Sequence, residues 1–412
     1  MSALIASQPR AAGLNFSWKA KALTSKFPKL CLKQAPPKMM PLRPFPSKKA
    51  QVEVQFNWIY VLIAGAVILA FFGSLVIFIK GQAEDRRAVE TLNALNSIFV
   101  GAGISEKTKN FIETPEVELV FACQDGISSF NLKQGEFPPK NPAAPIFSPA
   151  EIKSKQLAAW SLPYKFPFKI MDILMLSSAK DAGGIKYYIV GESPLKEELK
   201  KNLEVQTPLS GEFWPGFDVS FLSDVSEAVD QNNYAVRFIF LAGPSFSLPV
   251  WISSLPSEKV TGLSIANKEI SFLSLKNNQL TANSVIPLPS IAEENDPLIY
   301  AAIFADSEEA YLCQMQKVFN KMSKIILIYE SKTTALKDFY QKKSAINPLD
   351  NNYQICGNLL IKITEGLAVM KSNANSCVNK LSGSACQTLL ENALAVKEDN
   401  TNLMQQSCAQ LY

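Results

Sequence analysis

The sequence from Phe56 to Ile79 reads FNWIYVLIAGAVILAFFGSLVIFI and contains no Lys, Arg, Asp or Glu. As a helix rising about 1.5 Å per residue, it would extend about 36 Å, enough to cross an apolar layer of about 30 Å with some tilt. Trp58 and Tyr60 near one end and Lys80 at the other are typical of the membrane–water interface. The alternative, a helix buried in a soluble core, rarely exceeds about 14 uninterrupted apolar residues. The stretch therefore predicts one transmembrane helix, with the lipid bilayer as partner.

Charge and histidine content limit the function classes. Residues 1–50 contain Lys and Arg but no acid, and the remainder of the chain is mildly acidic, although the overall net charge is +4. A mildly acidic remainder argues against a nucleic-acid-binding domain. Histidine is absent, which excludes His-based triads, HExxH zinc sites and imidazole bases. The sequence therefore favours a protein that is not an enzyme and has no cofactor, no metal site and no nucleic-acid partner.

Charges and cysteines together predict the orientation in the membrane. Basic residues precede the apolar stretch and mixed charges, Glu84 to Arg87, follow it, so the positive-inside rule places the N-terminus in the cytoplasm. One cysteine, Cys31, precedes the stretch. An even number follow it, on the side assigned to the oxidising exterior, where disulfides persist, although their pairing stays open. These are Cys123, Cys313, Cys356, Cys377, Cys386 and Cys408.

The first 50 residues are rich in Pro, Ser, Ala and Lys and have too little periodic apolar pattern to fold. We expect a disordered cytoplasmic segment or leader. Two alternatives remain open: an organelle transit peptide, which is also acid-free, or a true start at Met39 or Met40, which would leave the short basic leader MPLRPFPSKKA.

The junction before the apolar helix, Lys48-Lys49-Ala50-Gln51-Val52, resembles the class III signal peptide of archaeal type IV pilin-like proteins. The resemblance implies cleavage between Ala50 and Gln51, after which the apolar helix stays as the anchor. Ala50 stands where Gly is commoner in that family, and Glu53 is the third mature residue where the family usually has an acid at the fifth. The general plan also resembles uncharacterised archaeal single-pass surface proteins.

Apolar periodicity divides the rest of the chain. A stalk helix is expected over residues 81–103, because Val89, Leu92, Leu95, Ile98 and Phe99 form one stripe that Gly101 and Gly103 end. Residues 104–305 alternate strand and helix patterns, which predicts an α/β ectodomain with a mixed, partly parallel sheet. Within it, Ser148-Pro149-Ala150-Glu151 predicts a capped helix start, and residues 299–306, IYAAIFAD, a last buried strand.

The C-terminal residues 306–412 are expected to form an antiparallel helical bundle. A long stripe begins after Ser307, Asn347-Pro348 stops it, and two further amphipathic segments follow. A disulfide requires Cα atoms within about 7 Å. An antiparallel arrangement therefore predicts that Cys313 meets Cys377 or Cys386 but not Cys356, and that Cys356 pairs with Cys408. Cys123 would either pair with the remaining cysteine or stay buried as a small apolar residue, and burial is the outcome we expect.

The remaining motifs support no chemistry. Gly191-Glu192-Ser193-Pro194 lies where a nucleophile elbow or phosphate loop would sit but lacks the flanking glycines, so Ser193 is expected to cap a helix. Cys377 and Cys386 have neither a CxxC spacing nor a histidine to suggest metal binding. The acidic pairs Glu293-Glu294 and Glu308-Glu309 are read as loop and helix-start charges, and no calcium loop is found.

The leading hypothesis is a single-pass cell-membrane protein with an extracellular domain, acting as a structural or interaction component of the envelope. Its sharper version is pilin-like, with other envelope or pilus-like subunits as partners. The alternative is a membrane-anchored extracellular hydrolase, which without histidine would need a lysine desolvated beside a serine in a cleft.

Overall fold

The computed structural model describes residues 50–133, 137–204, 214–230, 235–241, 243, 248–292, 294–379 and 384–412, without the side chains of 50–57 and 80–85. The predictions for residues 1–49, and the interface role of Lys80, lie outside the described part. The chain divides into two units, residues 1–73 and 74–412, each of which is described by itself.

Helix α1 runs from Ala50 to Ala102. Its segment Trp58–Ile79 is the one helix within the described residues that is long and apolar enough to cross a membrane, and none of it is buried. Length and composition alone support the span. In the second unit, part of the predicted stripe on α1 packs as expected: Leu92, Leu95 and Phe99 are buried, whereas Val89 is 40% exposed. The Phe99 ring meets Phe130 edge-on at 5.0 Å between centroids.

The first sheet has the strand order β2-β1-β4-β5-β3 and is antiparallel except where β3 pairs with β5. Its strands are β1 (Lys109–Gln124), β2 (Ile127–Leu132), β3 (Ile146–Phe147), β4 (Glu151–Lys165) and β5 (Lys169–Ser178). The predicted helix after Ser148 is wrong, because Glu151 begins β4. The fifteen-residue strand β4 pairs with β1 on one side and β5 on the other, and these long-range bonds outweigh a local capping signal.

The second sheet has the order β11-β10-β9-β8-β6-β7, and β12 also pairs with β10. Strands β7, β6, β8 and β9 are parallel and β10 to β12 are antiparallel, so the predicted mixed sheet is confirmed. The strands are β6 (Ile185–Val190), β7 (Val219–Leu222), β8 (Ala235–Phe240), β9 (Val260–Ala266), β10 (Glu269–Lys276), β11 (Gln279–Ala282) and β12 (Ile286–Pro287).

Connections on the two faces of this sheet bury different cores. Helix α2 (Pro194–Leu203) joins β6 to β7 and buries Leu199 and Leu203 in the main core. The 3₁₀ turns η1 (Val225–Glu227) and η2 (Val250–Ser254) bury Val225 and Ile252 on the opposite face, and η3 (Ser257–Lys259) leads into β9. Crossovers on both faces follow from the right-handed rule when successive connections move in opposite directions along a sheet.

Helix α3 (Pro297–Phe304) is buried except at the half-buried Ile299, and it contacts β3, β4 and β5 of the first sheet and β9 of the second. The predicted strand at 299–306 is therefore wrong: an unbroken apolar run has no period, and this one is buried on almost all sides. Arg237 of β8, 1% exposed, donates to the carbonyl oxygens of Ala302 (3.1 Å) and Asp306 (2.9 Å). It thus satisfies the Ala302 carbonyl at the negative end of α3 and fixes the chain just beyond that end at Asp306.

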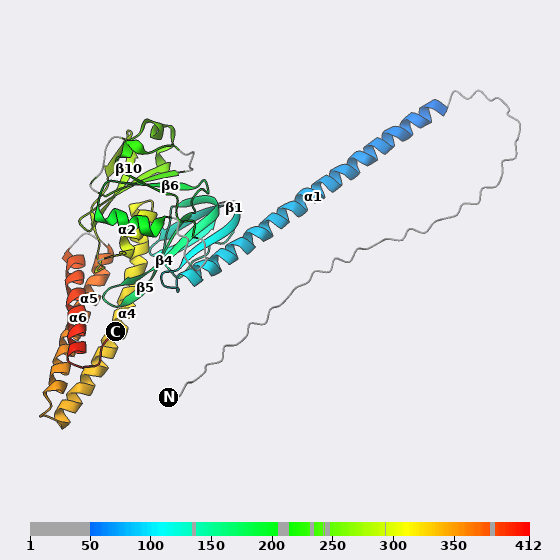
Figure 1. Ribbon diagram of the computed structural model, residues 1–412. Helices are drawn as coiled ribbons and strands as arrows, with labels where there is room; N and C mark the ends of the chain where they lie inside the picture. The colour runs from blue at the N-terminus through cyan, green and yellow to red at the C-terminus, as the bar shows by residue number, and fades with distance from the viewer. Residues whose placement is uncertain are drawn as a thin grey trace, which may run out of the picture. The chain divides into compact units, whose positions relative to one another are not determined.

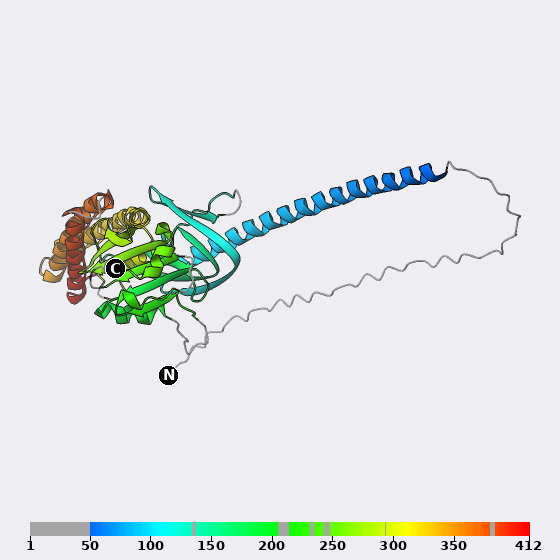
Figure 2. The same ribbon diagram turned by 90° about the horizontal axis from the view of Figure 1, so that it is seen from above.

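The C-terminal region consists of α4 (Glu308–Ile346), α5 (Asn351–Asn379) and α6 (Ser384–Gln405), visible in yellow to red in Figures 1 and 2. Ser307 caps α4 and Asn347 ends it, as expected. Contacts from Glu330 to Lys371 and from Ser323 to Asn375 show that α5 runs back along α4. The first part of α4 packs instead on β1, β2, β3 and β5.

The three disulfides are Cys123–Cys313, Cys356–Cys408 and Cys377–Cys386. The pairing of Cys356 with Cys408 matches the prediction. The predictions that Cys313 meets Cys377 or Cys386, and that Cys123 stays unpaired, are wrong. Helix α5 is ten residues shorter than α4 (29 against 39), so it does not reach Cys313, and Cys377 pairs across the α5–α6 connection. Cys313 lies in the part of α4 that packs on β1.

Candidate functional site

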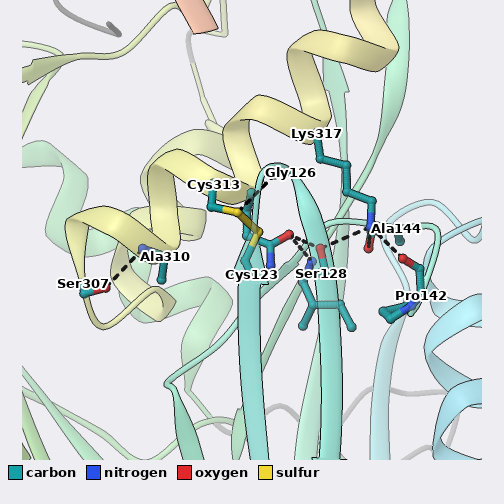
Figure 3. The surroundings of a disulfide bond; sticks show 11 residues. Cys123, Gly126, Ser128, Pro142, Ala144, Ser307, Ala310, Cys313 and Lys317 are labelled. Carbon is teal, nitrogen blue, oxygen red and sulfur yellow. Dashed lines mark hydrogen bonds between the residues drawn. A yellow bond between two sulfur atoms is a disulfide. The ribbon is translucent and has the colours of Figure 1, made fainter. Parts of the chain in front are cut away.

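A serine–lysine pair lies where the β1–β2 hairpin meets α4 (Figure 3). The hairpin turns at Asp125-Gly126, whose φ angles of 52° and 74° are those of a type I′ turn. The disulfide from Cys123 to Cys313 joins this hairpin to α4. Lys317 follows Cys313 by one helical turn, so it reaches the same hairpin, where Ser128 lies on β2.

Every hydrogen of the Lys317 ammonium has an acceptor. Its Nζ donates to Ser128 Oγ (3.1 Å) and to the carbonyl oxygens of Pro142 (2.6 Å) and Ala144 (3.2 Å). The Ser128 hydroxyl in turn donates to Gln314 Oε1 (2.7 Å), which also accepts from the Ile146 amide (3.3 Å). Burial lowers the pKa of Lys317 to about 8, while the acceptors favour its charged form.

This geometry indicates a structural role for the cluster of Ser128, Gln314 and Lys317, which we call the clamp. A lysine that activates serine must offer its lone pair to the hydroxyl hydrogen, but here that hydrogen points to Gln314 and Lys317 is the donor. Ser128 is 3% exposed, so a substrate has little access to its Oγ. The cluster fixes the hairpin and the segment that leads to β3 onto α4.

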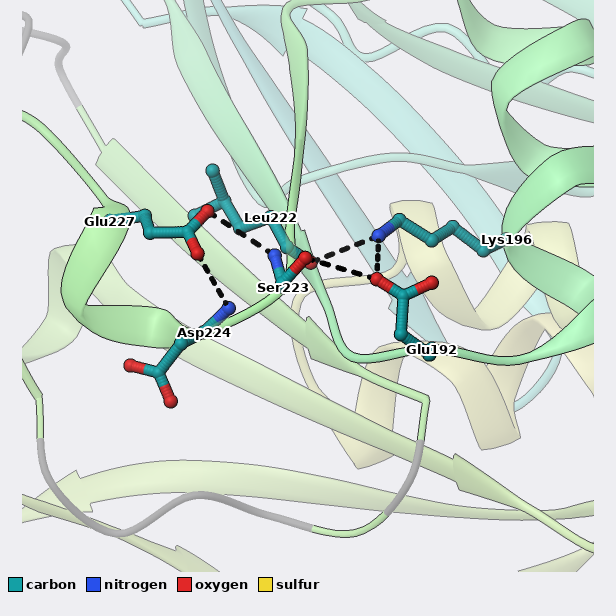
Figure 4. A network of polar contacts seen from close by, with 6 residues as sticks. All are labelled: Glu192, Lys196, Leu222, Ser223, Asp224 and Glu227. Carbon is teal, nitrogen blue, oxygen red and sulfur yellow. Dashed lines mark hydrogen bonds and ion pairs between the residues drawn. The ribbon is translucent and has the colours of Figure 1, made fainter.

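A second polar cluster lies at the carboxyl ends of the parallel strands β6 and β7 (Figure 4). Lys196 of α2 pairs with Glu192 (2.6 Å), and the Ser223 hydroxyl donates to the same Glu192 oxygen (3.1 Å). These two partners lower the pKa of Glu192. Asp224 and Glu227 form a capping box around η1. The groups satisfy one another and hold together the two connections that leave the sheet.

A crevice of about 510 Å³ lies beside this cluster, lined by Ser193, Glu198, Leu241 and Asp296 among others. It lies outside the carboxyl ends of β8 and β9, where open α/β sheets commonly bind ligands. Its acids are engaged: Glu198 accepts from the Tyr300 hydroxyl (2.8 Å), and Asp296 accepts from the Leu298 amide (2.9 Å) as the cap of α3. Burial raises the pKa of Asp296.

The residues that the sequence suggested as candidates for catalysis or metal binding lie as follows. Ser193 caps α2, its Oγ accepting from the Leu195 amide at 3.3 Å. Cys377 and Cys386 form a disulfide, and the described residues hold no group of three or more potential metal ligands among Cys, Asp and Glu. Glu308 accepts from Ser284 Oγ at 2.6 Å, in the first turn of α4. Glu294 lies in a loop, and Glu293 lies outside the described residues.

The possible processing site, Ala50 and Gln51, forms the start of α1. Sequence reasoning missed the pairing of Ser128 with Lys317, which are 189 residues apart and carry no motif. The only available signal was Cys123, the one cysteine within residues 104–305, which lies near Ser128 in the sequence. Comparison of the chain with protein-family models, with curated proteins and with solved structures finds no match in any of the three.

Proposed function

We propose that this chain is a membrane-anchored cell-envelope protein whose disulfide-bonded domain lies outside the cell and acts as a structural or interaction component. The observation that carries the proposal is a pairing of two features. Trp58–Ile79 exposes an uninterrupted apolar surface along a helix of membrane-spanning length. Every cysteine after that helix is in a disulfide, which is typical of proteins in oxidising compartments.

Charge supports the orientation. The acid-free basic residues before the helix favour a cytoplasmic N-terminus, which leaves the disulfides outside. The sharper, pilin-like version of the proposal has cleavage between Ala50 and Gln51 and assembly with other envelope or pilus-like subunits.

Topology is tested on intact cells that express the full chain with a tag at each end. A membrane-impermeant protease should remove the C-terminal tag and leave the N-terminal residues protected, whereas detergent should make both accessible. Protection of the C-terminal domain in intact cells would overturn the proposed orientation. N-terminal sequencing of the mature protein tests the pilin-like version: a start at Gln51 supports it, and intact residues before Ala50 contradict it.

The alternative, an anchored hydrolase, is favoured by one observation, the 3.1 Å contact between Lys317 and Ser128. A fluorophosphonate reagent labels an activated serine covalently. The clamp geometry predicts that the reagent does not label the full chain. The matched Ser128→Ala variant should show the same background signal. Labelling that is lost in Ser128→Ala would instead establish a serine–lysine hydrolase.

A further inference from the structure

A basic cleft of about 510 Å³ opens where the start of β1, the end of β4 and helix α6 approach one another. Four of its lining residues are lysines from four places in the chain: Lys107 before β1, Lys109 in β1, Lys165 at the end of β4, and Lys397 in α6. Among the described lining residues, Glu294 is the one carboxylate. The cleft therefore carries a concentrated positive charge on a chain that is otherwise mildly acidic beyond residue 50.

Lys109 is held in place rather than mobile. Its Nζ lies 5.2 Å from the ring centroid of Trp160 and 5.6 Å from that of Trp214, within the range of cation–π attraction. It donates to the carbonyl oxygen of Asn202 at 2.8 Å, and the Asn202 side chain is in turn bonded to the Tyr300 hydroxyl at 2.7 Å. A cation fixed in this way loses less conformational entropy when an anion binds.

Part of the remaining wall is apolar, and Tyr164, Asn202, Ser290 and Asn295 add polar groups to it. Leu162, Pro163, Pro167, Ile291 and Pro297 line the cleft beside the lysines. A ligand that fills it would therefore present an anionic group to the lysines and an uncharged, compact part to this wall. Such a combination of apolar lining and a few placed polar groups is typical of small-molecule sites.

We propose that this cleft binds a small organic anion, with its carboxylate or phosphate group beside Lys109 and its apolar part against the proline-rich wall. The proposal goes beyond the envelope role and does not depend on it.

Proton uptake gives the site a measurable signature. Burial lowers the pKa of Lys109 to about 8 in the free protein, and a bound anion would raise that pKa again by favouring the ammonium. The other charged groups that line the cleft are Lys107, Lys165, Lys397 and Glu294. Above pH 8 Lys109 is partly deprotonated in the free protein. Anion binding must then be coupled to the uptake of a proton, so affinity should fall as the pH rises from 8 to 9.5.

The test uses the full chain in lipid nanodiscs and isothermal titration calorimetry with three matched probes. Benzoate and phenyl phosphate represent the two anion classes, and benzamide is the uncharged control. We expect at least one anion to bind, at least tenfold more tightly than benzamide, with net proton uptake at pH 8.5. Whichever anion binds more tightly identifies the class. Failure of both anions to bind, or equal binding of benzamide, would overturn the proposal.

Variants locate the binding. Lys109→Met should weaken the anion at least tenfold and abolish the proton uptake, whereas Lys109→Arg should retain binding without uptake, because arginine stays charged. Lys397→Gln, on an exposed part of α6, should weaken binding several-fold without affecting the fold. The matched control is Lys155→Met, an exposed lysine on β4 that pairs with Glu116 away from the cleft. Unchanged affinity in both Lys109→Met and Lys397→Gln would contradict the assigned site.

Discussion

The α/β region and the helical region of α4 to α6 are stabilised in different ways. The α/β region buries charged groups, such as Arg237 against α3 and Lys186 against Asp218, and a disulfide between cysteines 190 residues apart joins it to α4. The far part of the helical region closes on itself through two disulfides whose cysteines lie 52 and 9 residues apart. Long-range contacts specify one arrangement of the two sheets, whereas a helical hairpin needs only its apolar stripe, its turn and cross-links over shorter separations.

The disulfides should show this difference most strongly. Replacing both Cys123 and Cys313 by Ser opens a link between cysteines 190 residues apart, and the chain-entropy relation gives a loss of about 5 kcal/mol in the free energy of unfolding. The same relation gives about 2.6 kcal/mol for Cys377→Ser with Cys386→Ser, whose separation is 9. Chemical denaturation of both double variants in detergent measures the two losses, and an equal loss would contradict the loop-length argument.

The buried ion pair of the α/β region should give the next largest effect. Lys186 Nζ lies 2.6 Å from Asp218 Oδ1, and both side chains are about 95% buried, with exposed fractions of 5% and 4%. Lys186→Met leaves a carboxylate buried without its cation and should cost about 3–5 kcal/mol. The double variant Lys186→Met, Asp218→Leu should recover most of that loss. If the double variant is as unstable as the single one, the ion pair stabilises the fold by more than the mutual neutralisation of its two charges.

Two glycines of α5 test how tightly the helical region is packed. A Cβ on Gly366 would lie 2.8 Å from Val396 Cγ2 of α6, whereas a Cβ on Gly357 would have its nearest neighbour at 4.0 Å. Gly366→Ala should therefore destabilise by about 1–2 kcal/mol through overpacking, less the gain in helix propensity. Gly357→Ala, its matched control, should stabilise by about 0.5–1 kcal/mol. Thermal unfolding of both variants decides whether α5 and α6 are in close contact.

The clamp on α4 should give the smallest effect, as a pH dependence. The pKa of Lys317 is about 8 in the folded chain and near its usual 10.5 when unfolded. Below pH 8 the amine is charged in both states, so the cost of burying it is fully present. As the pH rises from 8, the unfolded state binds more protons and stability increases, by about 1 kcal/mol up to pH 9.5 after allowance for solvent screening.

Lys109, whose pKa is also about 8, contributes in the same direction. Lys317→Met should therefore reduce the rise in stability between pH 8 and 9.5 without abolishing it. A rise unchanged from that of the parent chain would show that Lys317 does not titrate in this window.

Local signals predicted much of the fold. The stripe that starts after Ser307 and the stop at Asn347-Pro348 gave the bounds of α4, and the cap at Ser193 gave the start of α2. The buried helix α3 was missed because its eight apolar residues carry no period. Asp296-Pro297 was the overlooked signal, since an aspartate before a proline is a typical helix start, and Asp296 does cap α3.

The contacts between distant segments could not be read from the sequence. Ser128 and Lys317 meet because a hairpin turn rests on a helix, and nothing in either local sequence encodes that packing. Lys107, Lys109, Lys165 and Lys397 likewise converge only once β1, β4 and α6 are in place. The pairing of Cys123 with Cys313 also depends on the packing of distant segments. Residue spacing could not predict it, because α4 packs both on the first sheet and on α5.

That disulfide also determines how the chain would respond to tension. A pull between the α1 end and the C-terminus would be carried across the Cys123–Cys313 bond, so the residues between the two cysteines would not lengthen under load. With a separation of 190 residues and about 3.5 Å per extended residue, about 66 nm of contour length stays hidden while the bond is oxidised. Reduction would release that length, so the extensibility of the chain between its two ends depends on the redox state of one bond.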